Sequence, residues 1–309
     1  MQNDSITVVL PLIAIMLSGF LVGRFGLLPE NGSKVISRFV YLVAMPAFIF
    51  ISLAGIPIED IFNWSYLAVL GGGMLTVFVL GLIAARYVFA GSLTEGSLHA
   101  LTAMFSSTAY IGLPLILIIF GEAGLAPGII GAVITGAVFI PLAIILAEVD
   151  KGRTGRKVVT TSALAVLRSP LLIATVAGLL TSASGISVAA PVTAFCKLLG
   201  SAFIPCALFA AGLFISQCSL KGEVREISWL VAVKLLLHPL ITWWLAFHVF
   251  ELEGILPVIA VLQAALPSGV PVFVLAQHYE SFVSRSSAVI VVSTVLSMLT
   301  LPVVFILLA

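Results

Sequence analysis

Ten apolar runs, each long enough to cross a membrane, constrain this chain more than any other feature. A hydrocarbon core of about 30 Å takes about 20 helical residues to cross. Of the 309 residues, 61% are hydrophobic and 9% are charged, whereas soluble domains carry about 25% charged residues. We therefore predict an all-α integral membrane protein with ten transmembrane helices. We place them near Ile6–Val22, Val35–Leu53, Tyr66–Val88, Leu98–Phe120, Gly124–Ala147, Ala163–Leu180, Val192–Ile215, Trp229–Phe250, Ile255–Ala276 and Ala288–Leu308.

The net charge and the spacing of the cysteines limit the ligands and partners that we expect. A net charge of +1 provides neither a basic face for nucleic acid nor an acidic tail, so we expect no nucleic-acid partner. No Lys or Arg precedes the first apolar run, and we interpret that run as a retained span rather than a signal peptide. Cys196, Cys206 and Cys218 show no metal-ligand spacing. We predict no metal site and no cofactor.

Basic residues indicate the orientation, because Lys and Arg collect in short cytoplasmic loops. Twelve of the 14 lie in the odd-numbered connections or the adjoining helix ends, and the other two, Lys197 and Lys234, lie inside predicted helices. The even-numbered connections and both termini hold none. We expect a multi-pass protein of the cell inner (plasma) membrane with both termini on the non-cytoplasmic side.

An internal repeat accounts for the spacing of several prolines and glycines. One offset of 159 residues relates the pairs Pro11/Pro170, Gly19/Gly178, Pro46/Pro205 and Phe50/Phe209. We predict a first five-helix repeat at 1–150, a cytoplasmic linker at 151–162 and a second repeat at 163–309. Because five is odd, the second repeat is inverted relative to the first.

The fourth and ninth apolar runs contain groups that a regular membrane helix would avoid. Ser106, Ser107, Thr108, Tyr110, Gly112 and Pro114 lie in the fourth run, and Gln263, Pro267, Ser268, Gly269 and Pro271 lie in the ninth. Proline removes a backbone donor and clashes with the preceding turn. We expect breaks near Gly112–Pro114 and Pro267–Pro271 that meet each other. Ordinary proline kinks are the alternative, and the hydroxyls could simply bond the preceding turn.

These two motifs, the proline-bearing second and seventh helices and the 5+5 layout resemble the auxin efflux carrier family over essentially the whole chain. That family includes plant auxin exporters and bacterial permeases, some named as malonate or malate transporters. The resemblance implies an elevator-type fold, with a scaffold domain and a transport domain whose fourth and ninth helices cross at unwound centres. Ser107 stands where the family often has asparagine. A homodimer through the scaffold domain is a further assembly that we consider.

Charged residues inside the spans are candidates for function. Lys234 lies about five residues from a predicted helix end, and we expect its ammonium to extend to the interface. Lys197 matches Arg38 at the repeat offset of 159, so both are candidates to attract an anion. All 13 acidic residues fall at a terminus, a loop or a helix edge. We take this as an argument against coupling through a buried carboxylate.

The function that fits these features best is secondary transport of a small organic anion, a mono- or dicarboxylate, by elevator-type alternating access. The sequence contains no ATP-binding loop and no motif of an intramembrane hydrolase, so we expect no enzyme. Two alternatives stay open: a sodium- or proton-coupled symporter of another small solute, and a non-transporting membrane sensor. The candidate substrate-binding residues are Ser106, Ser107, Thr108, Tyr110, Gly112, Pro114, Gln263, Pro267, Ser268, Gly269, Pro271, Lys197 and Arg38.

Overall fold

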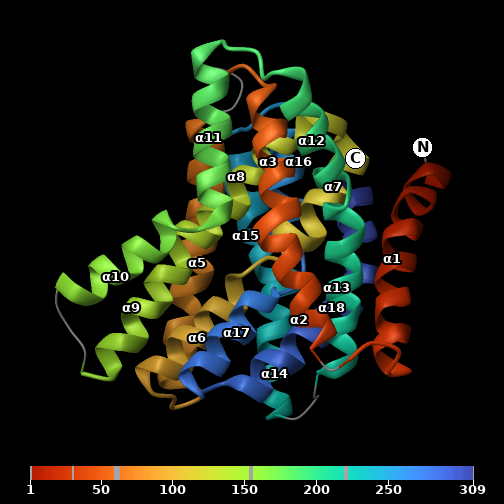
Figure 1. Cartoon of the computed structure of the whole chain (residues 1–309). Coiled ribbons are helices and arrows are strands. Elements are labelled where there is room, and N and C mark those ends of the chain that lie inside the picture. The colour runs from red at the N-terminus through yellow and green to blue at the C-terminus, as the bar shows by residue number, and fades with distance from the viewer. Residues whose placement is uncertain (1, 30, 59–62, 153–155, 219–221, 309) are drawn as a thin grey trace. The chain divides into compact units, whose positions relative to one another are not determined.

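The computed structural model of the chain describes residues 2–29, 31–58, 63–152, 156–218 and 222–308, and these residues form helices joined by short connections, with no strand among them (Figure 1). The chain divides into two compact units. The first unit comprises Met1–Asn63, Ala109–Ile130 and Leu167–Gln217, and the second unit comprises Trp64–Thr108, Gly131–Val166 and Cys218–Ala309. Each unit therefore combines segments from both halves of the sequence.

The first unit is built from helices at the beginning and in the middle of the chain. Its elements are α1 (Gln2–Arg24), α2 (Gly32–Phe39), η1 (Val40–Ala44), α3 (Met45–Ala54), α7 (Leu113–Phe120), η3 (Gly121–Gly124), the start of α8 (Leu125–Ile134), α11 (Pro170–Ser184), α12 (Ala190–Ser201) and α13 (Phe203–Gln217). Within this unit α1 packs along α13, and α3 packs along α11.

Two glycines make these helix pairs approach closely. A Cβ at Gly19 would lie 2.1 Å from the carbonyl oxygen of Phe209, and a Cβ at Gly178 would lie 3.0 Å from that of Phe50. Small residues allow such backbone contact between membrane helices. The two contacts exchange partners under the offset of 159 residues, which is the reciprocity that two related repeats would produce.

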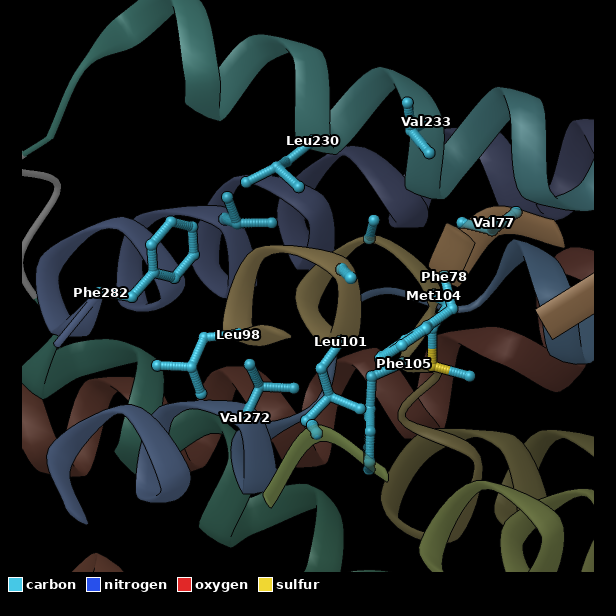
Figure 2. Packing of buried hydrophobic residues seen from close by; sticks show 14 of the residues in the cluster. Val77, Phe78, Leu98, Leu101, Met104, Phe105, Leu230, Val233, Val272 and Phe282 are labelled. Atoms are coloured by element: carbon cyan, nitrogen blue, oxygen red, sulfur yellow. The ribbon is translucent and has the colours of Figure 1, made fainter. Parts of the chain in front are cut away.

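The second unit holds the longest helices. Its elements are α5 (Trp64–Tyr87), α6 (Leu93–Met104), η4 (Thr135–Phe139), α9 (Ile140–Asp150), most of α10 (Arg156–Leu167), α14 (Val224–Ala232), η5 (Val233–Leu237), α15 (His238–Trp244), η6 (Leu245–Val249), α16 (Leu256–Ala265), α17 (Val270–Tyr279) and α18 (Val283–Leu308). Figure 2 shows its apolar core around α6. Leu98 and Leu101 of α6 belong to the same buried cluster as Leu230 of α14, Val272 of α17 and Phe78 of α5.

Four π-helical turns share one cause. The turns η1, η2 (Thr108–Gly112), η4 and η5 each run directly into an α-helix whose second residue is proline. The prolines are Pro46, Pro114, Pro141 and Pro239. A proline ring clashes with the carbonyl four residues earlier, and a π-turn shifts that carbonyl to an i→i+5 bond. The sequence analysis expected breaks or kinks at such prolines and did not foresee these turns.

Six helices of the described residues are long and apolar enough to cross a membrane, and the bent pair α16 and α17 would make a seventh. One of the six, Leu93–Asp150, covers 58 residues; it includes the non-helical residues 105–107 and contains two of the ten predicted spans. Shorter apolar helices occur at Leu10–Arg24 and Pro170–Ser184. The chain is an integral membrane helical protein, and the count of ten spans stays a prediction.

The predicted sixth span needs correction. The span was expected at Ala163–Leu180, but α10 ends at Leu167 and α11 begins at Pro170. Proline disfavours helical geometry in the residue before it, and Ser169 accordingly adopts an extended conformation. Most of the predicted linker 151–162 is helical, since α10 begins at Arg156. Residues 153–155 of that linker lie outside the described residues.

The odd-numbered connections of the second unit lie at one end of it. Arg285, after the ninth connection, forms ion pairs with Glu95, after the third, and with Glu226, after the seventh. The backbone N–H and the hydroxyl of Thr94 both donate to Asp150, which precedes the fifth connection. This grouping agrees with the alternation of basic loops in the sequence, while the membrane side that they face stays a prediction.

Candidate functional site

The first interruption of the fourth run lies earlier than expected. Helix α6 ends at Met104, Phe105 is extended (φ −64°, ψ 118°), and regular helix resumes through η2 and α7. The predicted break at Gly112–Pro114 was wrong in position. Pro114 is the second residue of α7, which follows η2 without a gap, so the π-turn accommodates the proline ring without a break.

The second interruption falls where the prolines predicted it. Helices α16 and α17 are bent by 43°, and Leu266 and Gly269 between them are both extended, with ψ near 151°. Pro267 lacks the N–H that would continue α16. Glycine is required at 269 because a Cβ there would lie 2.5 Å from the ring of Phe105. The predicted break at Pro267–Pro271 is confirmed.

The two interruptions meet each other inside the second unit, as expected from the sequence. The Ser107 N–H donates to the Pro267 carbonyl at 2.9 Å. The Ser268 hydroxyl donates to the Thr102 carbonyl at 3.1 Å, and the Ser268 N–H donates to the Ser293 hydroxyl at 3.2 Å. We call the residues 105–108 and 266–269 the crossover. Backbone groups released by the two breaks are thereby partly satisfied by each other, which lipid could not do.

Lys234 brings its amino group to this crossover. Its side chain is 0% exposed, and its ammonium donates to the Ser106 hydroxyl at 2.9 Å and to the Ala264 carbonyl at 2.6 Å. The third contact is His238 Nδ1 at 3.1 Å. Because an ammonium only donates, Nδ1 accepts, and the His238 ring proton is on Nε2. The expectation that Lys234 extends to the interface was wrong, since acceptors at the crossover are within reach.

Helix ends determine the local electrostatics. The ammonium of Lys234 lies at the carboxyl ends of α16, through Ala264, and of α6, through Ser106. These ends carry partial negative charge, whereas the amino end of α17 in the same crossover carries partial positive charge. The crossover therefore contains both a site that favours a cation, which Lys234 occupies, and backbone that favours an anion.

Two further polar side chains lie in the crossover or next to it. The Thr108 hydroxyl is buried and has no hydrogen-bond partner in the described part of the chain. Gln263 is buried near the end of α16 and donates through Nε2 to the Tyr66 hydroxyl at 2.9 Å. Gly131 leaves room for it, because a Cβ at 131 would lie 1.7 Å from Gln263 Oε1. Gln263 is thus a closely packed side chain, and Thr108 has an unused hydroxyl.

The structure brings part of the predicted site together. Seven candidate residues lie at the crossover or within one turn of it, all in the second unit: Ser106, Ser107, Thr108, Gln263, Pro267, Ser268 and Gly269. Pro271 follows as the second residue of α17. The remaining candidates belong to the first unit, in which Tyr110 is half-buried and the side chains of Arg38 and Lys197 are exposed: Tyr110, Gly112, Pro114, Arg38 and Lys197.

The sequence analysis missed a buried ionic network in the second unit. His99 Nδ1 lies 2.7 Å from Glu226 Oε1, and Arg285 donates to Glu226 Oε2 at 2.9 Å and also to Glu95. Glu226 is only 2% exposed, and the His99 ring stacks on Trp229 at 5.1 Å. Glu226 does lie at a helix edge, but α6 and α18 cover it. A helix-edge position therefore did not imply solvent exposure.

The first unit contains an apolar recess of about 380 Å³. Its lining offers no hydrogen-bonding group apart from the thiol of Cys206, so it does not fit a charged solute. The lining residues are Ile15, Val35, Ile36, Phe39, Pro205, Cys206 and Phe209. Within the described ranges, no group of three or more His, Cys, Asp or Glu side chains is placed to hold a metal ion.

Comparison with known proteins gives a consistent result over the length of the chain. A profile of the family described as "Membrane transport protein" matches residues 4–305. A "Putative malonate transporter" of Rhizobium meliloti (strain 1021) is 26% identical over 294 residues, covering 94% of this chain and 92% of the relative. An "Uncharacterized transporter" of Methanothermobacter thermautotrophicus is 27% identical over 296 residues, covering 95% of each chain. The "Uncharacterized transporter YfdV" of Escherichia coli (strain K12) is 26% identical over 298 residues, covering 95% of this chain and 94% of the relative.

Proposed function

Because this chain belongs to the membrane transport protein family, which is the auxin efflux carrier family that its motifs resemble, we propose that it is a secondary transporter of a small organic anion. The substrate would be a mono- or dicarboxylate that binds at the crossover. Transport would follow elevator-type alternating access in the cell inner membrane, with both termini on the non-cytoplasmic side.

The observation that carries the proposal is the amino group of Lys234, which is buried at the crossover; in its protonated form it would be a positive charge. Its three partners, a hydroxyl, a carbonyl and a neutral imidazole, carry no compensating negative charge. A carboxylate about 4 Å away would interact with it by about 4 kcal/mol at an effective dielectric constant of 20. An exposed helix end contributes about 0.3 to 1 kcal/mol, so Lys234 would be the main attraction for an anion.

Polar groups around this charge would orient the substrate. The unused hydroxyl of Thr108 and the amides at the start of α17 are candidates for this role. Ser106, Ser107 and Gln263 would complete the site. Arg38 and Lys197, exposed on the first unit, would attract anions from solution rather than hold them.

The division into units supports the elevator mechanism. The first unit takes the predicted spans one, two and seven and nearly all of span six, and the second unit takes spans three, eight, nine and ten. Three of the five equivalent pairs (one and six, two and seven, three and eight) therefore fall in the same unit, whereas spans four and five are divided between the units. The reciprocal contacts of Gly19 and Gly178 fit inverted repeats at 1–150 and 163–309. We propose that the second unit, which contains the crossover, is the moving transport domain and that the first unit is the scaffold, through which a homodimer would form.

A proton-coupled form of transport is the second candidate. The buried pair of His99 and Glu226 removes the argument, made from the sequence, that no buried carboxylate is available for a proton. Flux measured with and without a pH gradient, with buffers of equal ionic strength, distinguishes this form from passive transport.

The proposal is tested first by a ligand screen and then by flux. Mono- and dicarboxylates are added to the detergent-purified protein, beginning with malonate because one relative is named for it. A ligand at 100 times its dissociation constant stabilises the folded protein by about 2.7 kcal/mol. The stabilising compound is then followed into proteoliposomes, and binding without flux would favour the sensor alternative.

A matched pair of variants locates the site. Lys234→Met should weaken binding of the stabilising anion at least about tenfold, which corresponds to 1.4 kcal/mol. Lys34→Met is the control, because Lys34 is an exposed lysine on α2 of the first unit. Equal affinity of the two variants, or stabilisation by uncharged and cationic solutes alone, would contradict an anion site at Lys234.

A further inference from the structure

We propose that Lys234 is protonated at the crossover and that its ammonium is a resident cation, which occupies the position where a metal ion would otherwise bind. The protein would then bind its anion without any alkali-metal ion. The part of this inference that concerns anion binding rests on the proposed function. The part that concerns the excluded metal ion rests on the geometry of the crossover alone.

The partners of the ammonium are those that sodium prefers in broken membrane helices. Unwound carbonyls and the carboxyl ends of half-helices coordinate Na⁺ in transporters. Here the Ala264 carbonyl is at the carboxyl end of α16, and the Ser106 hydroxyl follows the carboxyl end of α6. The nitrogen of Lys234 lies 2.6 and 2.9 Å from these two oxygens. A covalently attached cation thus uses the oxygen atoms that a free cation would need.

A π-helical turn holds the backbone at Lys234. Lys234 is in the π-turn η5, which directly precedes α15 and its second residue, Pro239. Single π-turns inside helices occur frequently at functional sites. His238, four residues after Lys234, accepts the third N–H, so all three donors of the ammonium are satisfied. Hydrogen bonds to all three donors reduce the cost of burying this group.

This arrangement predicts how the site binds cations with and without the ammonium. A second cation beside a buried ammonium would be repelled, so Na⁺ should not bind in the wild-type crossover. Removing the ammonium while leaving the oxygens in place should open a polar space for a small cation. Filling the same space with an apolar side chain should not.

The cation test needs no substrate. Melting temperatures of the purified protein are compared in NaCl, LiCl, KCl and N-methyl-D-glucamine chloride at equal ionic strength. The wild type and Lys234→Met should show no cation-specific shift, whereas Lys234→Ser should be stabilised by Na⁺ or Li⁺ in a concentration-dependent way. A Na⁺-specific shift of the wild type would overturn the inference, and this measurement requires no variant. A folded Lys234→Ser protein that responds to none of the cations would overturn it as well.

The anion test uses any carboxylate that stabilises the wild type. Lys234→Met should lose about tenfold or more in affinity in every salt. Lys234→Ser should bind weakly in N-methyl-D-glucamine and regain about tenfold in Na⁺. Wild-type affinity in Lys234→Met would show that the ammonium is not the counter-charge of the anion. If no anion stabilises the wild type, the proposed function fails, while the cation test still decides the inference.

Discussion

Removal of the Glu226 carboxylate should destabilise the protein more than removal of any exposed acid. Its two oxygens bind His99 and Arg285 at 2.7 and 2.9 Å. In Glu226→Ala the buried His99 loses its partner at Nδ1, which costs about 1 to 3 kcal/mol. Arg285 still pairs with Glu95, and its side chain is 25% exposed. The free energy lost at Arg285 is therefore smaller than at His99. We expect a total of about 3 kcal/mol, the low end for breaking a buried ion pair.

Thermal unfolding of the purified protein measures this loss. At about 2 °C per kcal/mol for a chain of this size, the melting temperature of Glu226→Ala should fall by about 6 °C. The control is Glu223→Ala, because Glu223 precedes the same helix, is exposed and carries the same charge. Glu226→Gln keeps one acceptor oxygen, so its melting temperature should lie between those of Glu226→Ala and Glu223→Ala. Equal melting temperatures of Glu226→Ala and Glu223→Ala would refute the reasoning from burial.

Three further results are expected. Gly131→Ala should displace the amide of Gln263 and cost about 1 to 3 kcal/mol of overpacking, measured by thermal unfolding; an unchanged melting temperature would contradict the contact. Gly178→Leu should destabilise by at least as much, because α3 leaves no room for the side chain, and normal folding would exclude that helix contact. In a background without Cys196, Cys206 and Cys218, an impermeant thiol reagent on intact cells should label Ile186→Cys, which is 70% exposed in the wild type, and not Lys151→Cys. The opposite labelling would reverse the orientation.

Local properties of the sequence were enough for the membrane class and for the second break. Hydropathy over about 20 residues reports on lipid directly, and Pro267 removes a helical donor whatever surrounds it. The prediction that the two breaks meet was correct in part, because the break that contacts Pro267 lies at 105–107 and not at Gly112–Pro114. It depended on the repeat, since Pro114 and Pro271 hold equivalent places at the starts of α7 and α17.

The position of the first break, and which charges are buried, depended on tertiary contacts. The chain leaves helical geometry at Phe105 rather than at Pro114, where Ser107 can donate to Pro267, 160 residues later. Lys234 is buried because its acceptors come from segments 128 and 30 residues away. Glu226 is buried because His99 and Arg285 surround it. A buried polar group must find a partner, and for these groups the partner is distant in sequence, so only the folded chain decides which residues form the site.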